Sequence, residues 1–432
     1  MHNPLWLDNI DLQEFDELKS DIKTETLIIG GGIAGILAAY FLTNSGIDCT
    51  LVEKDRICRG VTCGTTGKIT SQLGLIYSDL IKKFGVEKAK GYLFANNSAI
   101  DEYKKLCQKI DCDFEIKDNY VYSLNNYKLS KEIDALCKIG YKAEFKEIKN
   151  IPVANFGAVK FPEQAQFHPI KFLKNIVNNL KIYENTFVLE VEGKNVTTNK
   201  GKIIAENIIV ATHFPFIDSH GSYFLKLYQH RSYAIAINNA KDINGMYVSD
   251  RNNGLSFRNY KDLLILIGGS HRTGKNGGNY TEIEQFARIH YPQSKIMYRW
   301  ATQDCMSLDN VPYIGKYSKN TANMYVATGF NKWGMTGAMT SAKIICDMIM
   351  GKNNEYSEIF SPIRSMITSQ LAINGFEAVT NILNPFGKRC PHLGCSLKWN
   401  KVERTWDCPC HGSRFTSDGE VLDNPANGDL KL

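Results

Sequence analysis

The sequence predicts an α/β protein in which a nucleotide-binding domain is joined to an antiparallel sheet and to a small C-terminal metal module. Three observations support this prediction. An apolar strand at 26–29 leads into a glycine-rich turn and a helical pattern. Short strand-like segments alternate with turns across 231–267, and two Cys/His pairs lie near the C-terminus. A chain of 432 residues is long enough for two or more domains.

Composition and charge are those of an ordinary soluble globular protein. The net charge is +6, but lysine and arginine are spread among acidic residues, which favours a solvated surface over a nucleic-acid interface. The apolar stretch 26–42 contains four glycines, so it is better explained as a strand and a helix than as a membrane span. Residues 1–20 lack the zones of a signal peptide, and eight of the 12 cysteines are scattered singly. We therefore expect a cytoplasmic protein with buried free thiols and no nucleic-acid partner.

The glycine-rich turn 30–35 has the spacing of a dinucleotide fingerprint and stands between a strand and a helix. Gly30 permits the tight turn, Gly32 lets the backbone approach a pyrophosphate, and Gly35 permits close packing of the helix on the strand. A second strand, 49–52, ends in Glu53, where an acidic side chain accepts ribose hydroxyls. The alternative is a purely structural glycine-rich turn.

The rest of the chain favours FAD over NAD. Reductases that take electrons from NAD(P)H usually carry a second fingerprint, and the glycines at 268–269 and 274–278 have neither its spacing nor its helix. Instead, a strand at 207–210 leads into 211–213, and a strand near 324–328 leads into 333–336 and a helix at 338–350. This layout predicts one FAD, whose isoalloxazine is capped by the returning C-terminal segment, and no tightly bound NAD(P).

Two thiols and two imidazoles near the C-terminus form a Rieske ligand set, namely Cys390, His392, Cys408 and His411. In such a centre one iron of a [2Fe-2S] cluster keeps two Cys ligands and the other takes two His ligands, which raises the reduction potential. Zinc is the alternative, since Cys and His pairs also suit a tetrahedral site. Zinc ribbons usually have two-residue gaps in both pairs, whereas Cys390 and His392 are separated by one residue.

At these residues the chain resembles the FAD-dependent oxidoreductases of the D-amino-acid oxidase and glycine oxidase superfamily, in the subgroup that has a Rieske domain. The resemblance rests on the ordered motifs at 30–35, 64–70, 210–215, 311–315 and 329–336. It implies a Rossmann-like FAD-binding domain, with Thr65 and Thr66 under the flavin and a backbone contact from Val188 to adenine. The expected cofactor-binding residues are Gly30, Gly32, Ile33, Ala34, Gly35, Glu53, Lys54, Thr65, Thr66, Val188, Ala211, Thr212, Gly315, Gly334, Met335 and Thr336.

The resemblance also bears on the cluster. Cys395 and Cys410 stand where high-potential Rieske proteins carry a disulfide between the two cluster loops. The resemblance implies that Ser413 donates a hydrogen bond to a cluster sulfide, which would raise the potential, whereas Phe415 stands where such proteins have a tyrosine that donates a second bond. Losing that bond predicts a midrange potential. The module lacks most of the usual base strands, so we expect it to depend on the rest of the protein for stability.

The antiparallel sheet is expected to carry the substrate groups. In the superfamily an arginine commonly binds a substrate carboxylate as a bidentate pair, and Arg231, Tyr233 and Arg258 are the candidates here. Trp300 and Trp333 are candidates for pocket walls. The alternative for each of these side chains is an ordinary surface or core role.

The expected domains are an oxidoreductase at 1–362, a linker with apolar anchors at 363–383 and a Rieske module at 384–432. Within the first, the FAD-binding part is expected near 22–75, 150–215 and 305–352, and the substrate part near 76–149 and 216–304.

The leading functional hypothesis is an FAD enzyme that takes a hydride from an amine or amino-acid-like substrate. Its electrons would pass singly through the Rieske cluster to an unidentified acceptor. One alternative is a redox sensor or electron carrier without turnover. Another is a Rieske oxygenase, but that needs a mononuclear iron site with two His and a carboxylate, and no such motif is recognisable among the histidines.

Overall fold

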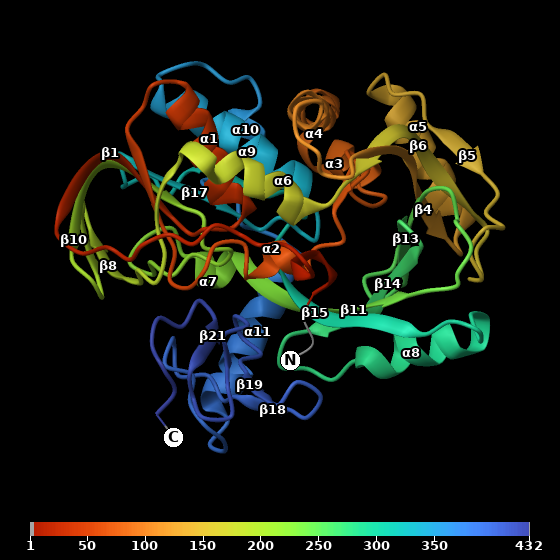
Figure 1. The fold of residues 1–432 in the computed structure, drawn as a ribbon. Coiled ribbons are helices and arrows are strands. Elements are labelled where there is room, and N and C mark those ends of the chain that lie inside the picture. The colour runs from red at the N-terminus through yellow and green to blue at the C-terminus, as the bar shows by residue number, and fades with distance from the viewer. Residues whose placement is uncertain (1–3, 432) are drawn as a thin grey trace.

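The computed structural model describes residues 4–431, which form two large sheets, a small C-terminal sheet and the helices around them (Figure 1). The first large sheet has the order β16-β17-β10-β1-β2-β7, and its neighbours from β17 to β7 are parallel. Its strands are β16 (Tyr313–Lys316), β17 (Met324–Thr328), β10 (Lys202–Val210), β1 (Ile22–Ile29), β2 (Cys49–Val52) and β7 (Lys181–Tyr183), with the hairpin β8 (Val188–Glu192) and β9 (Asn195–Thr198) attached to β10.

Helix α1 (Ile33–Asn44) packs between this sheet and α9 (Gly334–Ile349), which explains why it is apolar on almost every side. Two further helices, α6 (Pro169–Ile176) and the four-residue α2 (Val61–Gly64), pack against each other next to the glycine turn. The strand–turn–helix unit predicted at the N-terminus is therefore present, and the helix expected at 338–350 begins four residues earlier, at Gly334.

The second large sheet has the order β15-β11-β14-β13-β12-β4-β6-β3. Its strands are β15 (Ile296–Ser307), β11 (Leu227–Ile237), β14 (Leu263–Arg272), β13 (Ser256–Tyr260), β12 (Met246–Ser249), β4 (Glu115–Ser123), β6 (Gly157–Gln166) and β3 (Lys68–Ile69), with β5 (Glu144–Lys146) on β6. The sheet is antiparallel except for the parallel β12–β4 pair. It includes β6, which the sequence analysis placed in the FAD-binding part.

Helices cover both ends of the second sheet. The helices α3 (Tyr77–Phe84), α4 (Val86–Cys107) and α5 (Asn126–Lys138) lie at the β4–β6 end, and α8 (Asn279–His290) packs on β14 and β11 (Figure 1). The short helices are α7 (Tyr223–Lys226), α10 (Ser357–Phe360) and the 3-10 turns Leu5–Leu7 and Val177–Asn179. Trp6, in the first of these turns, is completely buried and donates a hydrogen bond to the Thr65 carbonyl at 2.6 Å.

The C-terminal module is a four-stranded sheet, β18 (Lys398–Asn400), β19 (Thr405–Asp407), β20 (Arg414–Phe415) and β21 (Val421–Asp423). It has a small apolar core of its own that contains Phe415 and Leu397. Figure 1 shows it below β11 and β15, so the module rests on the second sheet.

The segment expected to be a linker contains the helix α11 (Ser369–Leu383). The expectation that apolar side chains anchor this segment is wrong. Ile373, Phe376 and Val379 are exposed, and the buried side chains of the helix are Asn374 and Asn381. The expectation of buried scattered thiols holds for six of the eight cysteines, while Cys137 is exposed and Cys107 is half-buried.

Gly35→Ala tests the packing of α1 on the glycine turn. A Cβ at this position would lie 2.0 Å from the Gly30 carbonyl oxygen, a contact between backbone atoms that no side-chain rotation relieves. We expect overpacking to cost about 1–3 kcal/mol and to lower the melting temperature and the bound flavin together. Gly428→Ala is the matched control, because nothing lies within 4 Å of its added Cβ. Equal melting and flavin content in the two variants would contradict this packing.

Candidate functional site

A cavity of about 1200 Å³ lies at the carboxyl ends of β1, β2 and β10. Three parts of the chain line it: the glycine turn of the first sheet, strands β11, β14 and β15 of the second sheet, and the segments 402–405 and 421–424 of the C-terminal module. The cavity exceeds the roughly 300–1,000 Å³ typical of small-molecule pockets. It is large enough for a dinucleotide cofactor together with a small substrate.

Most of the expected cofactor-binding residues line this cavity. Those that do are Gly30, Gly32, Ile33, Ala34, Glu53, Lys54, Thr65, Thr66, Val188, Ala211, Thr212, Gly334 and Met335. Gly35 lies behind the turn, and Thr336 donates a hydrogen bond to the Thr70 carbonyl at 3.1 Å. Gly315 lies in β16, close to Met348 and Pro362. The roles of all these residues in cofactor binding stay predictions.

The glycine turn leaves room for a phosphate. Gly30 has φ +114°, and a Cβ there would lie 2.6 Å from the Ala211 carbonyl oxygen. The Gly31 amide donates to the Glu53 carboxylate at 2.6 Å, so this side chain is held at the end of β2. Burial raises the pKa of Glu53, and the hydrogen bonds from Gly31 and Asp55 oppose that rise. Because α1 begins at this turn, its N-terminus faces the cavity, and the residues present fit a dinucleotide.

The three candidate substrate residues have different surroundings. Arg231 lines the cavity, but its guanidinium is paired with Glu403 of the C-terminal module. The Tyr233 hydroxyl donates to the same carboxylate at 3.1 Å. Arg258 is 1% exposed, lies outside the lining and donates to the Gly67 carbonyl at 2.9 Å. Burial lowers the pKa of Arg258 to about 9. Both tryptophans, Trp300 and Trp333, do line the cavity.

Sequence reasoning identified Glu53 but missed two other acidic groups of this cavity, Asp304 and Glu403. Asp304, on β15, has a pKa raised to about 6 because burial outweighs its attraction to Lys332 and Arg231. Glu403 was missed because it lies 172 positions from its partner Arg231, and only the docking of the module joins them. No local motif marks either residue.

The four expected cluster ligands come together in two loops of the C-terminal module. Cys390 and His392 precede β18, and Cys408 and His411 lie between β19 and β20. The two imidazole rings are 4.9 Å apart between centroids. Their Nδ1 atoms are buried without a hydrogen-bond partner, and the Cys390 and Cys408 thiols are free and buried. Two unpartnered ring nitrogens beside two free thiols fit a Rieske cluster.

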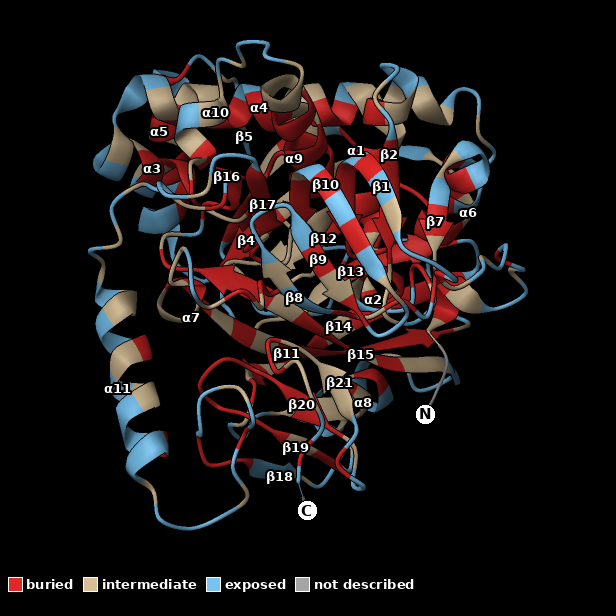
Figure 2. Ribbon diagram, turned by 90° about the vertical axis from the view of Figure 1, so that its left-hand side faces the viewer, coloured by how far each residue is buried: buried red, intermediate tan, exposed pale blue. Residues whose placement is uncertain are grey.

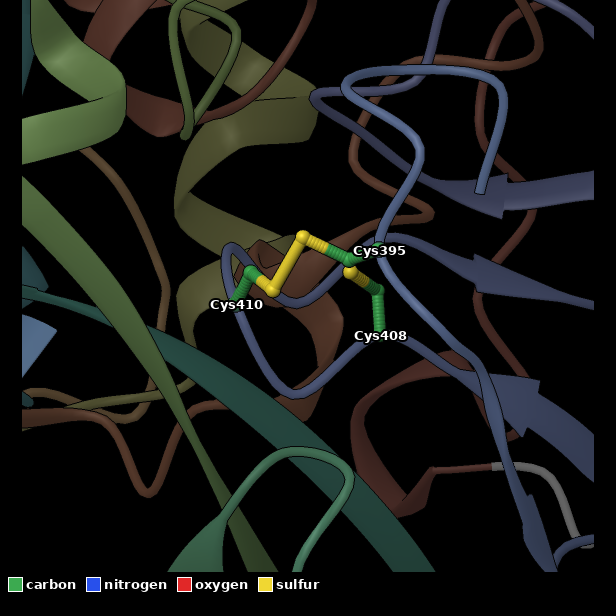
Figure 3. Close-up of side chains that lie close together, drawn as sticks. All are labelled: Cys395, Cys408 and Cys410. Carbon is green, nitrogen blue, oxygen red and sulfur yellow. A yellow bond between two sulfur atoms is a disulfide. The ribbon is translucent and has the colours of Figure 1, made fainter. Parts of the chain in front are cut away.

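A disulfide joins the two cluster loops through Cys395 and Cys410. Figure 3 shows this bond beside Cys408, and the three sulfur atoms lie within 4.8 Å of one another. Two of these sulfurs are bonded to each other, so we do not regard the three as a metal-binding set.

Both cluster loops face the flavoprotein part of the chain. The His392 Nε2 atom lies 2.8 Å from the Asp218 carboxylate. Gln229 on β11 donates to the His411 carbonyl at 3.0 Å, and Gln303 on β15 donates to the Gly412 carbonyl at 2.9 Å. The side chain of His392 is 3% exposed and His411 is 4% exposed. The flavoprotein part of the chain therefore covers both imidazoles.

A second group of contacts joins the module to the nucleotide end of the cavity. Asn424 donates to the carbonyls of Thr212 and Phe214, at 2.8 and 2.5 Å. Asn427 donates to the Leu189 carbonyl at 2.9 Å, next to the expected adenine contact at Val188. The module thus contacts segments on the cofactor side as well as the substrate side of the cavity.

Glu403 lies at the centre of the contact between the C-terminal module and the second sheet. Its carboxylate accepts from Arg231 Nε at 3.0 Å and from Arg414 Nη2 at 2.8 Å. Burial alone would raise the pKa of Glu403, but Arg231 and Arg414 lower it to about 2. The carboxylate is therefore ionised across the physiological pH range and bridges the two parts of the chain.

Comparison with known proteins agrees with these features. The family model of FAD dependent oxidoreductases matches residues 25–348, and that of the Rieske [2Fe-2S] domain matches 370–432. The chain is 34% identical to YhfW of Bacillus subtilis, named as a Rieske 2Fe-2S iron-sulfur protein, over 99% of this chain and 96% of that protein. It is 22% identical to gamma-glutamylputrescine oxidoreductase of Escherichia coli, covering 78% and 86% of the two chains.

Among solved structures, L-proline dehydrogenase from P. horikoshii shares the fold with a TM-score of 0.67 at 19% identity, covering 81% of this chain and 98% of that one.

The match to the Rieske family model begins at residue 370, so it includes α11, which the sequence analysis placed in the linker. No helix between residues 4 and 431 is long and apolar enough to cross a lipid bilayer.

Glu403→Gln tests the bridge. Removing one partner of a buried ion pair typically costs about 3–5 kcal/mol, so thermal unfolding should begin at a lower temperature than in the wild type. Because the pKa of Glu403 is lower in the folded state than its unfolded value of 4.5, ionisation of Glu403 stabilises the fold at pH values above 4.5. This stabilisation disappears as the pH falls toward 2. The difference between wild type and variant should therefore be full above pH 4.5 and shrink below it. Glu420→Gln, at an exposed position, is the control. A difference that does not change with pH would contradict the bridge.

Proposed function

Because the chain belongs to the FAD-dependent oxidoreductase family and carries a Rieske [2Fe-2S] domain, we propose that it oxidises an amine and passes the electrons singly through the cluster to a separate acceptor. When bound, the flavin accepts a hydride and the cluster carries one electron at a time. The remaining steps depend on what the residues of this chain hold and position.

The observation that best supports this proposal is the shared cavity. The fingerprint residues at 30–34 and the module residues at 402–405 line the same space. A module that served only as a separate electron carrier would need no contact with the substrate side. Its position supports direct electron transfer within one chain.

We assign binding roles as follows. The glycine turn and the N-terminus of α1 would hold the pyrophosphate, and Glu53 the ribose. The N-terminus of α9, at Gly334 and Met335, would face the pyrimidine side of the flavin ring and stabilise its negative charge. Cys390, Cys408, His392 and His411 would hold the cluster.

The surroundings of the candidate substrate residues favour an amine over an amino acid as the substrate. Of the two arginine candidates for a carboxylate clamp, Arg231 is already paired with Glu403, and Arg258 lies outside the cavity lining and donates to the Gly67 carbonyl. The half-buried Asp304 presents a carboxyl that can bind an ammonium group. An E. coli relative is named gamma-glutamylputrescine oxidoreductase, after a molecule that carries an amine at one end and an α-amino acid at the other.

Anaerobic mixing with candidate amines and amino acids tests the proposal. We expect an amine to bleach the flavin absorbance and then to produce the Rieske signal in electron paramagnetic resonance. Asp304→Asn should raise KM for that amine more than it lowers kcat, because it removes the charge that attracts the ammonium. Faster reduction by amino acids than by any amine would contradict the substrate class. Reduction by neither class would favour a redox sensor without turnover.

His392→Cys tests whether the cluster is the electron outlet. An added thiolate keeps a ligand for iron and should lower the potential by roughly several hundred millivolts, toward ordinary ferredoxin values. Flavin bleaching should continue while the cluster signal fails to appear. His220→Cys is the control, at an exposed histidine outside the module. Unchanged rates with a one-electron acceptor, in a variant that keeps its cluster, would show that the cluster is not on the path.

A further inference from the structure

Helix α11 buries polar side chains and exposes apolar ones, which is the reverse of an ordinary surface helix. A surface helix buries an apolar stripe and exposes polar residues. In α11 the buried side chains are Asn374 and Asn381, while Phe376 is 69% exposed and Leu383 is 74% exposed. Figure 2 shows α11 at the edge of the molecule, with pale blue segments along its length.

The polar face of the helix is held in place by specific contacts. The Asn374 side chain accepts from Arg272 at 3.0 Å, and Glu377 forms an ion pair with Lys275 at 2.7 Å. The Asn381 carbonyl accepts from the Ser396 amide at 2.9 Å. Rotating the helix to bury its apolar side would break all three contacts. The exposed apolar face is therefore fixed by the fold.

The exposed face is large. Within the helix it comprises Ile373, Phe376, Val379, Ile382 and Leu383, and it continues through Ile367 before the helix and Phe386 after it. Each of these side chains is 45–89% exposed. Together they present roughly 600–900 Å² of apolar surface, more than the roughly 300–600 Å² of the largest patch on a typical monomer. A standard protein interface buries about 800 Å² on each partner.

We propose that this face binds the same face of a second copy of the chain, so that the protein is a dimer with α11 packed against α11. Within α11 the exposed residues Ala372, Phe376, Val379 and Leu383 follow one another in steps of four, three and four, which is the spacing of a helix–helix seam. Because a two-fold interface brings identical patches together, each patch must be compatible with itself. An uncharged apolar stripe meets that requirement.

The charge of α11 favours a second copy of the chain over an anionic membrane or an electron acceptor as the partner of this face. The sole charged residue of α11 is Glu377, which is turned inward and paired, and the helix contains no lysine or arginine. Helices that lie on anionic membranes usually carry basic residues on the polar face. Transient electron acceptors are usually steered by charged surfaces. A second copy needs neither feature, and the inference does not depend on the proposed function.

The contact would also affect the cluster loop. Arg272, which holds Asn374 of α11, donates in addition to the carbonyls of Pro409 and Cys410 at 3.1 Å each. Clamping α11 in a dimer would restrain Arg272 and hence the loop that carries Cys408 and His411.

Light scattering coupled to size-exclusion chromatography tests the proposal on the full, cofactor-loaded chain across a range of concentrations. We expect the wild type to have the mass of two chains. Phe376→Glu and, separately, Leu383→Glu should raise the dissociation constant of the dimer by roughly 30-fold or more, as expected at the centre of an interface. Both side chains are exposed in the monomer, so flavin and cluster content should not change. Phe156→Glu, at another exposed phenylalanine, is the control and should remain dimeric.

Three results would overturn the proposal. One is a wild type that is monomeric at every concentration tested. Another is a Phe376→Glu variant as dimeric as the control. The third is a monomeric wild type that sediments with vesicles of phosphatidylcholine and phosphatidylglycerol while Phe376→Glu does not, which would assign the face to a lipid surface.

Discussion

The arrangement of the molecule depends on one carboxylate shared by two guanidinium groups. Glu403 lies between Arg231 of the second sheet and Arg414 of the C-terminal module, and both arginines are 5% exposed. Neither arginine could be buried at acceptable cost without a counter-charge. Because the counter-charge of Arg231 comes from the other part of the chain, burial of this arginine requires the module to be docked. The same contact forms one wall of the cavity.

Docking also determines which surfaces of the cluster loops are accessible. The imidazole of His392 faces Asp218, and that of His411 lies against the rings of Phe214 and Phe224, so the flavoprotein part occupies the side from which another protein would approach them. Under the proposed function, an external acceptor would therefore have to approach the module from a different side. Exposed side chains of the first cluster loop, such as Leu393, remain available for that contact.

Local patterns were sufficient to predict the strand–turn–helix unit, the single nucleotide site and the cluster loops, because each depends on neighbouring residues. The cofactor families of both domains were predicted correctly from these motifs. The pairing of Arg231 with Glu403 could not be predicted, since the two residues are distant in the sequence and meet only in the docked fold. The orientation of α11 was missed for a related reason. Its apolar residues have helical spacing, and periodicity alone does not say which face meets the protein.

The order of domains along the chain has a consequence for biosynthesis. The glycine turn and both large sheets are complete by residue 328, whereas the residues that close the cavity lie at 402–427. Domains generally fold in the order in which they leave the ribosome. The flavoprotein part therefore passes through a stage in which its cavity is open, and the cofactor can enter without displacing the module. Once the second cluster loop has folded against Gln229 and Gln303, the module lines one side of the cavity. Docking of the module, which follows both large sheets in the sequence, would therefore slow cofactor release.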